Sequence, residues 1–124
     1  MSNKEIKLLK QPTDMSFTEN QNLKIAHNRL DHDGYRWWNK WFPVKGTSDK
    51  NVIEEMEVIS DYMTDKLKDG IASIYELIYD MVLIPLDSNQ TEYNVFYEGE
   101  YINCWIRLIT RRGDYNMYIH CYEK

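Results

Sequence analysis

The C-terminal stretch TEYNVFYEGEYINCWIRLITRRGDYNMYIHCYEK, residues 91–124, decides the fold of this chain. It contains three runs in which apolar and polar residues alternate, separated by two glycine-containing turns. A period of two is typical of a strand that buries one face and turns the other toward solvent. The stretch therefore predicts a three-stranded antiparallel meander.

The last two runs each have an inward face and an outward face. The inward face carries small and aliphatic residues, namely Ile102, Cys104, Ile106, Leu108, Met117, Ile119 and Cys121. The outward face carries polar and aromatic residues together with one isoleucine, namely Asn103, Trp105, Arg107, Ile109, Tyr118, His120 and Tyr122. We expect the inward face to be the platform on which the helices pack.

Two registers are open for this last hairpin. A turn at Gly113-Asp114 would place Arg107 opposite His120 and Trp105 opposite Tyr122. A turn at Arg112-Gly113 would instead place Arg107 opposite Tyr118 and Cys104 opposite Cys121.

A second hairpin is predicted over residues 23–42. Residues 23–31 alternate as a strand does, and Asp33-Gly34 is a strong signal for a two-residue turn, which would pair Leu30 with Trp37 and Asp31 with Arg36. The returning run, residues 35–42, fits helical spacing as well as strand spacing. Its aromatic content and the preceding turn favour a strand, which Pro43 would end.

Two helices are expected between these hairpins. The first begins with a capping box made by Asn51 and Glu54 and stops at Asp69-Gly70. Its apolar stripe is Val52, Met56, Ile59, Met63 and Leu67. The second has Ile71, Ile74, Tyr75, Ile78 and Val82 on its inner face and is closed by Pro85.

The predicted fold is thus α+β. A mostly antiparallel sheet, built from the N-terminal hairpin and the C-terminal meander, carries an αα-hairpin on one face. Residues 1–124 are expected to form a single domain, with residues 1–20 as an irregular N-terminal arm. No apolar run approaches the length of a membrane span or of a secretion signal, and two cysteines make no disulfide scaffold. We therefore expect a cytoplasmic protein with free thiols.

Charge is strongly segregated along the chain, whose net charge is −5. Residues 49–100 carry three basic and thirteen acidic side chains, a net charge of −10, whereas the flanking segments are both basic. This segment would repel nucleic-acid phosphates, so direct binding of nucleic acid is not expected.

Five of these thirteen acidic side chains lie on one face of the first predicted helix. Its outer face carries Glu54, Glu57, Asp61, Asp65 and Asp69, opposite the apolar stripe. Such a stripe can be an ordinary solvated face, or it can be a docking surface for a basic protein, as in a nuclease inhibitor. Because like charges four residues apart destabilise a helix, we take the docking surface as the functional hypothesis.

The outward face of the meander is the alternative site. Trp105, Arg107, Tyr118, His120 and Tyr122 could stack a nucleotide or other small ligand, form a homodimer surface, or simply be covered by the N-terminal arm. An enzyme built on Arg107, His120 and a carboxylate is a further alternative.

The remaining candidates for chemistry are weak. His27, Asp31, His32 and Asp33 lie close together in sequence, but they lack the further ligands of a calcium or zinc site and are interpreted as turn residues. Arg112-Gly113-Asp114 is interpreted as a turn. No phosphate-binding loop, nucleophile elbow or metal motif is present in the sequence. We therefore predict no catalytic residue, metal or cofactor, and expect an acidic inhibitor of a basic partner, such as a bacterial nuclease, of the anti-defence or immunity-protein type.

Overall fold

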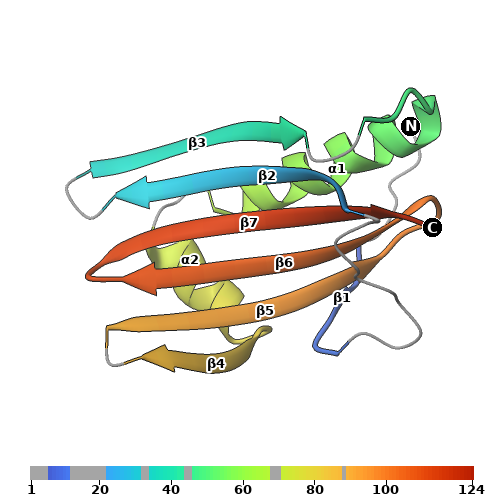
Figure 1. The fold of residues 1–124 in the computed structure, drawn as a ribbon. Helices are drawn as coiled ribbons and strands as arrows, with labels where there is room; N and C mark the ends of the chain where they lie inside the picture. Colours follow the sequence, from blue (N-terminus) through green and yellow to red (C-terminus); the bar gives the residue numbers. More distant parts are fainter. Residues whose placement is uncertain (1–5, 12–21, 32–33, 44–45, 68–70, 88) are drawn as a thin grey trace.

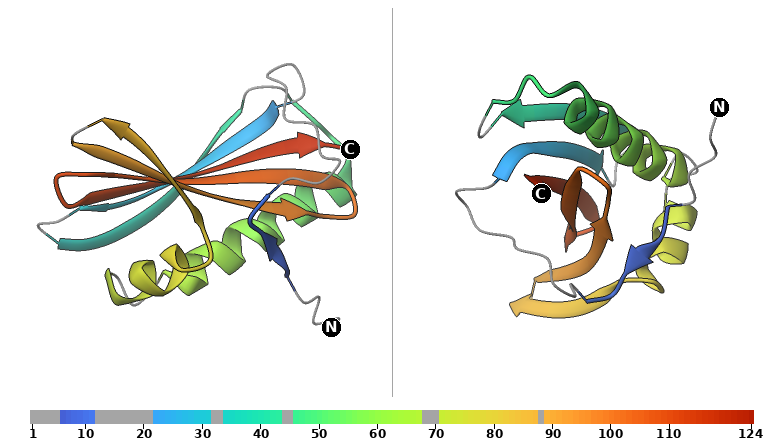
Figure 2. Two further views of the ribbon diagram at one scale, coloured as in Figure 1. Left: turned by 90° about the horizontal axis from the view of Figure 1, so that it is seen from below. Right: turned by 90° about the vertical axis from the view of Figure 1, so that its right-hand side faces the viewer.

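The computed structural model describes residues 6–11, 22–31, 34–43, 46–67, 71–87 and 89–124, and Figure 1 shows its ribbon. In chain order the elements are β1 (Leu8–Leu9), β2 (Asn22–Asp31), β3 (Gly34–Pro43), α1 (Lys50–Lys66), α2 (Ile71–Ile78), β4 (Val82–Asp87), β5 (Gln90–Glu98), β6 (Ile102–Arg111) and β7 (Asp114–Glu123). The strands form one strongly twisted antiparallel sheet, and both helices lie on the same face of it (Figures 1 and 2). The predicted α+β class with an antiparallel sheet is confirmed.

The order of strands in the sheet is β1-β5-β6-β7-β2-β3, with β4 also paired to β5. Two short strands therefore divide one edge of β5 between them. Residues of β1 pair with Tyr97 and Phe96, whereas β4 pairs with the residues from Asn94 to Gln90. The sheet joins the two predicted hairpins through β2 and β7, a pairing that local sequence patterns did not indicate.

The C-terminal meander forms as predicted, with β5, β6 and β7 adjacent. Its last turn is Arg112-Gly113, where both residues have positive φ (51° and 83°), as a two-residue hairpin turn requires. Cys104 consequently pairs with Cys121 and Arg107 with Tyr118. The alternative turn at Gly113-Asp114 is wrong, since it would shift the partner strand by two residues and leave Ile102 without the Glu123 partner it has here.

The N-terminal hairpin is also confirmed, and residues 35–42 belong to a strand, which ends at Pro43. Leu30 pairs with Trp37 as predicted. Asp31, however, pairs with Gly34 rather than with Arg36, because the register shifts between Leu30 and Asp31. The predicted turn residues His32 and Asp33 lie outside the described residues.

Helix α1 begins two residues earlier than its sequence suggested. The N-cap is Asp49, whose extended backbone lets one carboxylate oxygen accept from the amides of Asn51 (2.9 Å) and Val52 (3.3 Å). The predicted capping box of Asn51 and Glu54 is therefore wrong, because Asp49 already satisfies these early amides. The predicted stop at Asp69-Gly70 lies outside the described residues, and α1 has its C-cap at Leu67.

Helix α2 is much shorter than predicted, and α1 and α2 do not form a clear αα-hairpin. A turn ends α2, in which the amides of Asp80 and Met81 bond to the carbonyls of Leu77 and Ile78. The following residues, Val82 to Asp87, leave the helix to pair as β4 with the open edge of β5. Tyr75, predicted to face inward, is exposed.

The core lies between the helices and the sheet. Every residue of the predicted inward face is fully buried, and so is the apolar stripe of α1. Ile74, Leu77 and Met81 extend this core beneath α2 and the turn after it. The N-terminal segment, expected as an arm, contributes Ile6 and Leu8 to the margin of the core; residues 1–5 and 12–20 lie outside the described residues.

Candidate functional site

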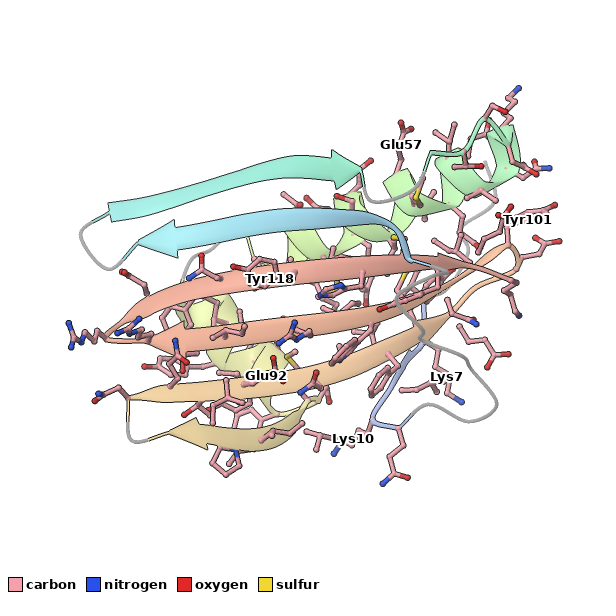
Figure 3. The ribbon with its side chains drawn as sticks, in the orientation of Figure 1. Lys7, Lys10, Glu57, Glu92, Tyr101 and Tyr118 are labelled. Carbon is pink, nitrogen blue, oxygen red and sulfur yellow. The ribbon has the colours of Figure 1, made fainter. Side chains whose placement is uncertain are left out.

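The predicted acidic face is solvent-exposed on α1. Glu54, Glu57, Asp61 and Asp65 are all exposed, while Asp69 lies outside the described residues. In Figure 3 the side chain of Glu57 extends away from the sheet. The helix therefore presents this stripe to solvent while its opposite side packs on the sheet.

Among the described residues, little positive charge offsets these carboxylates. Lys50 Nζ lies 3.8 Å from Glu54 Oε1, and both side chains are largely exposed, so the pair contributes little to stability. In the part of the chain that the structure describes, no basic nitrogen lies within 4.0 Å of Glu57, Asp61 or Asp65. Val58, 45% exposed, lies within the stripe and adds an apolar contact that the sequence analysis did not single out.

A buried carboxylate on the flank of α1 fixes the helix to the sheet. Glu55 accepts hydrogen bonds from the amides of Glu100 (3.0 Å), Tyr101 (2.7 Å) and Ile102 (2.9 Å), and from the hydroxyl of Tyr97 (3.3 Å). These amides form the connection from β5 to β6, so Glu55 supplies hydrogen bonds that the turn cannot make within itself. The role of Glu55 could not be predicted from the sequence, because its position beside the acidic stripe resembles that of its exposed neighbours.

Two features show how closely the Glu55 carboxylate fits. A Cβ added at Gly99 would lie 2.4 Å from Glu55 Oε1, so glycine leaves room for the carboxylate. Burial, followed by the charge of Glu55, raises the pKa of Tyr97 well above its usual value. The Tyr97 hydroxyl is thus held in its neutral, hydrogen-bond-donating form. The signal in the sequence was the turn at Gly99 and Glu100. A tight turn has free amides, so a hydrogen-bond acceptor such as Glu55 is expected to lie close to it.

The outward face of the sheet, seen toward the viewer in Figure 3, holds a connected polar network. Arg107 Nε donates to Glu92 Oε1 at 2.6 Å, and a terminal nitrogen of the same guanidinium also contacts this oxygen. Asn94 Nδ2 donates to the other oxygen of Glu92 (3.3 Å), and Trp105 Nε1 donates to Asn94 Oδ1. Glu92 and Asn94 are buried and were not predicted, although they alternate along β5 on this face.

His120 lies beside this network. Its ring stacks on Trp105 with centroids 5.3 Å apart and an interplanar angle of 29°, and the guanidinium of Arg107 lies 4.8 Å from the centre of the Trp105 ring. Burial, together with the positive charge of Arg107, lowers the pKa of His120 to about 4, although Glu92 opposes this shift. The imidazole is therefore neutral at pH 7.

The other members of the predicted outward site differ in accessibility. Tyr118 is half-buried, with its ring 6.5 Å from that of His120. Tyr122 is buried, so it does not present a free aromatic face. The structure thus brings together Trp105, Arg107 and His120 and adds a carboxylate, Glu92, to them.

Within the described ranges, no three side chains among His, Cys, Asp and Glu are grouped as metal ligands would be. The same ranges contain no helix with the length and apolar character needed to cross a membrane.

Comparison with known proteins gives no relative. No protein-family model matches the chain, and neither a curated protein nor a solved structure matches it. The function is therefore inferred from the surfaces described above.

Proposed function

We propose that this chain is a non-enzymatic binding protein whose α1 docks on a basic protein partner and inhibits it. The observation that carries the proposal is the exposed outer face of α1, where Glu57, Asp61 and Asp65 have no basic partner among the described residues. Repulsion between such carboxylates costs a few tenths of a kcal/mol for each pair four residues apart. A basic partner would remove this repulsion on binding.

The helix is also held rigidly enough to act as a preformed binding surface. Asp49 caps its first turn, Glu55 fixes its flank to the β5–β6 turn, and the apolar stripe packs on the sheet. A surface that is already ordered loses little conformational entropy on binding. Val58 would supply an apolar contact among the charges.

A bacterial nuclease is the class of partner that this chemistry suits. An enzyme that binds nucleic acid carries a basic surface, and a row of carboxylates on a helix can occupy that surface in place of phosphates. Complementary charge of this kind accelerates association and makes it sensitive to salt. An anti-defence or immunity function would follow from blocking such an enzyme.

The test is affinity capture with a charge-reversed variant. Glu57→Lys, Asp61→Lys and Asp65→Lys together should abolish capture of a basic partner from a bacterial lysate, and the captured protein should lose nuclease activity when the wild-type chain is added back. Capture by the wild type should weaken at high salt, since the screening length falls from about 10 Å at 0.1 M to about 3 Å at 1 M.

The matched control reverses Glu76, Glu98 and Glu123 to Lys, three exposed carboxylates outside α1. It changes the net charge by the same amount and should leave capture intact. Equal capture by wild type and the α1 variant would refute the proposal, as would equal loss in both variants.

The outward face of the sheet supports a second candidate, a ligand-binding or enzymatic site, because Arg107, His120 and Glu92 lie together there. A nucleotide at about a hundred times its dissociation constant would raise the free energy of unfolding by about 2.7 kcal/mol. Trp105→Phe should remove that increase. If no nucleotide shifts the thermal unfolding of the wild type, nucleotide binding at this face is excluded.

A further inference from the structure

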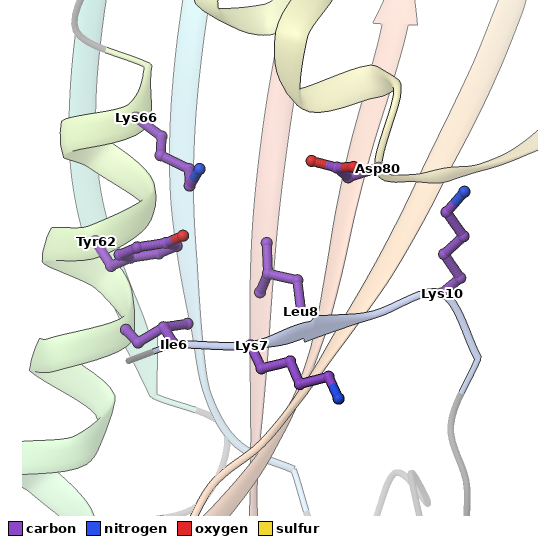
Figure 4. A pocket seen from close by; sticks show the side chains of 7 residues that line it. All are labelled: Ile6, Lys7, Leu8, Lys10, Tyr62, Lys66 and Asp80. Carbon is purple, nitrogen blue, oxygen red and sulfur yellow. The ribbon is translucent and has the colours of Figure 1, made fainter. Parts of the chain in front are cut away.

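A cavity of about 300 Å³ lies on the helix side of the molecule, away from the outer face of α1. It is open to solvent and is bordered by the N-terminal segment around β1, the last turns of α1 and the turn between α2 and β4 (Figure 4). Its lining combines the apolar side chains of Ile6 and Leu8 with the polar or charged residues Lys7, Lys10, Tyr62, Lys66 and Asp80. A volume of about this size is at the lower end of the range for small-molecule sites.

Positive charge exceeds negative charge at the border of the cavity, although the chain as a whole has a net charge of −5. Lys7, Lys10 and Lys66 border it, against the single carboxylate of Asp80, and in Figure 4 the side chain of Lys7 points away from the other lining residues. Among the residues that the structure describes, none of these lysine nitrogens has a carboxylate within 4.0 Å. In Figure 4, Lys66 and Lys10 extend from opposite sides of the cavity, and Asp80 lies between them in this view.

Local interactions explain the position of only one of these lysines, Lys66. Lys66 occupies the last turn of α1, where a cation is favoured by the helix dipole, and its ammonium lies 5.1 Å from the centre of the Tyr62 ring. Neither interaction involves Lys7 or Lys10, which come from a separate segment of the chain. Two segments far apart in sequence thus place ammonium groups around the same cavity.

We propose that this cavity binds a small phosphorylated molecule of the sugar-phosphate class. Lys66 and Lys10 would hold the phosphate as point charges, as lysines do in other phosphate sites. Asp80 would accept a hydrogen bond from a sugar hydroxyl, and Leu8 would contact the carbon skeleton. The chemistry of the lining thus favours an anion that also carries hydroxyl groups over a simple inorganic anion.

The experiment uses the full chain, labelled for NMR, in a low-salt buffer without phosphate. Ribose 5-phosphate and inorganic phosphate are the two probes. We expect ribose 5-phosphate to shift the amide signals of residues 6–10, 62–66 and 80 in a saturable way and to bind more tightly than inorganic phosphate. Lys66→Gln should weaken both probes by about tenfold, the loss that follows from removing one charged contact of about 1.4 kcal/mol.

Two further variants make the result specific. Asp80→Asn should weaken ribose 5-phosphate and leave inorganic phosphate unaffected or slightly tighter, since only the sugar uses Asp80. Lys50→Gln removes an exposed lysine at the other end of α1 and should leave both affinities unchanged. The proposal is overturned if neither probe shifts these amides, if the shifts map to residues 92–120 on the outward face, or if Lys50→Gln weakens binding as much as Lys66→Gln. An Asp80→Asn variant that binds ribose 5-phosphate as well as the wild type would overturn the sugar assignment.

Discussion

At the scale of single residues, Glu55 connects the helix layer to the sheet by polar contacts rather than by apolar packing. Its carboxylate accepts hydrogen bonds from three successive amides at the β5–β6 turn, and Gly99 leaves the space that the carboxylate needs. A buried carboxylate is costly unless hydrogen bonds replace its lost hydration. Here the three amides and the Tyr97 hydroxyl provide that replacement.

We therefore predict that Glu55→Gln destabilises the protein by about 2 kcal/mol, because hydrogen bonds to a charged group are the strong ones and the new amide nitrogen would face other donors. Urea unfolding followed by circular dichroism measures this. The exposed neighbour Glu54 is the control, and Glu54→Gln should change the free energy of unfolding by less than about 0.5 kcal/mol. Equal effects of the two substitutions would show that the Glu55 contacts do not stabilise the fold.

His120 should make stability depend on pH. Its pKa is about 4 in the folded protein and about 6.5 when unfolded, so the unfolded chain takes up the proton first as pH falls. The contribution of His120 is therefore fully present above pH 6.5 and is lost as the pH falls from there to about 4.

The measurement compares wild type with His120→Gln by urea unfolding across this pH range. As the pH is lowered, the wild type should lose more unfolding free energy than the variant, because the variant has no proton to gain at this position. An NMR titration of the histidine ring provides the direct value. A His120 that titrates near 6.5 in the folded protein would contradict the prediction.

At the scale of elements, the last hairpin depends on the Arg112-Gly113 turn. Arg112 has a φ of 51°, a conformation that asparagine adopts more readily than arginine and that favours Asn-Gly in such turns. We predict that Arg112→Asn stabilises the protein by about 0.5 kcal/mol, whereas Gly113→Ala destabilises it by about 1 kcal/mol. Thermal and urea unfolding measure both. If the two substitutions act in the same direction, the left-handed backbone at Arg112 and Gly113 does not control the stability of this turn.

The elements differ in how far sequence could predict them. Alternation in β6 and β7 fixed their buried faces, and Val52, Met56 and Ile59 marked the inner side of α1, because these patterns depend on local geometry. The extent of α2 could not be predicted in this way. Val82 continues a helical spacing, and only the open edge of β5, brought close by the fold, makes the segment a strand.

Polar contacts within the sites depended on the same long-range packing. Glu92 and Arg107 are fifteen residues apart, and Glu55 lies more than forty residues from the amides that donate hydrogen bonds to it. No local pattern distinguishes Glu55 from the exposed Glu54, because both follow the start of the same helix. The acidic stripe itself could be predicted, since helical periodicity alone places Glu57, Asp61 and Asp65 on one side.

At the scale of the whole molecule, negative and positive charge gather on different surfaces. The negative stripe of α1 faces solvent, whereas Lys10 and Lys66 flank an open cavity elsewhere on the helix side. A basic protein and a small anion would therefore bind at different places. If both proposals hold, charge reversal on α1 should abolish capture of the partner. Ribose 5-phosphate should still shift the amide signals of residues 62–66 in a saturable way.

The division of the β5 edge between β1 and β4 also bears on self-assembly. Growth of a fibre by strand addition needs two long open edges on every copy. On this side the sheet ends in a strand of two residues and a strand of six residues that contains Pro85, which has no amide hydrogen to donate. Among the described strands, β3 is thus the long edge left for strand addition, and pairing of two copies at this edge would not by itself continue into a filament.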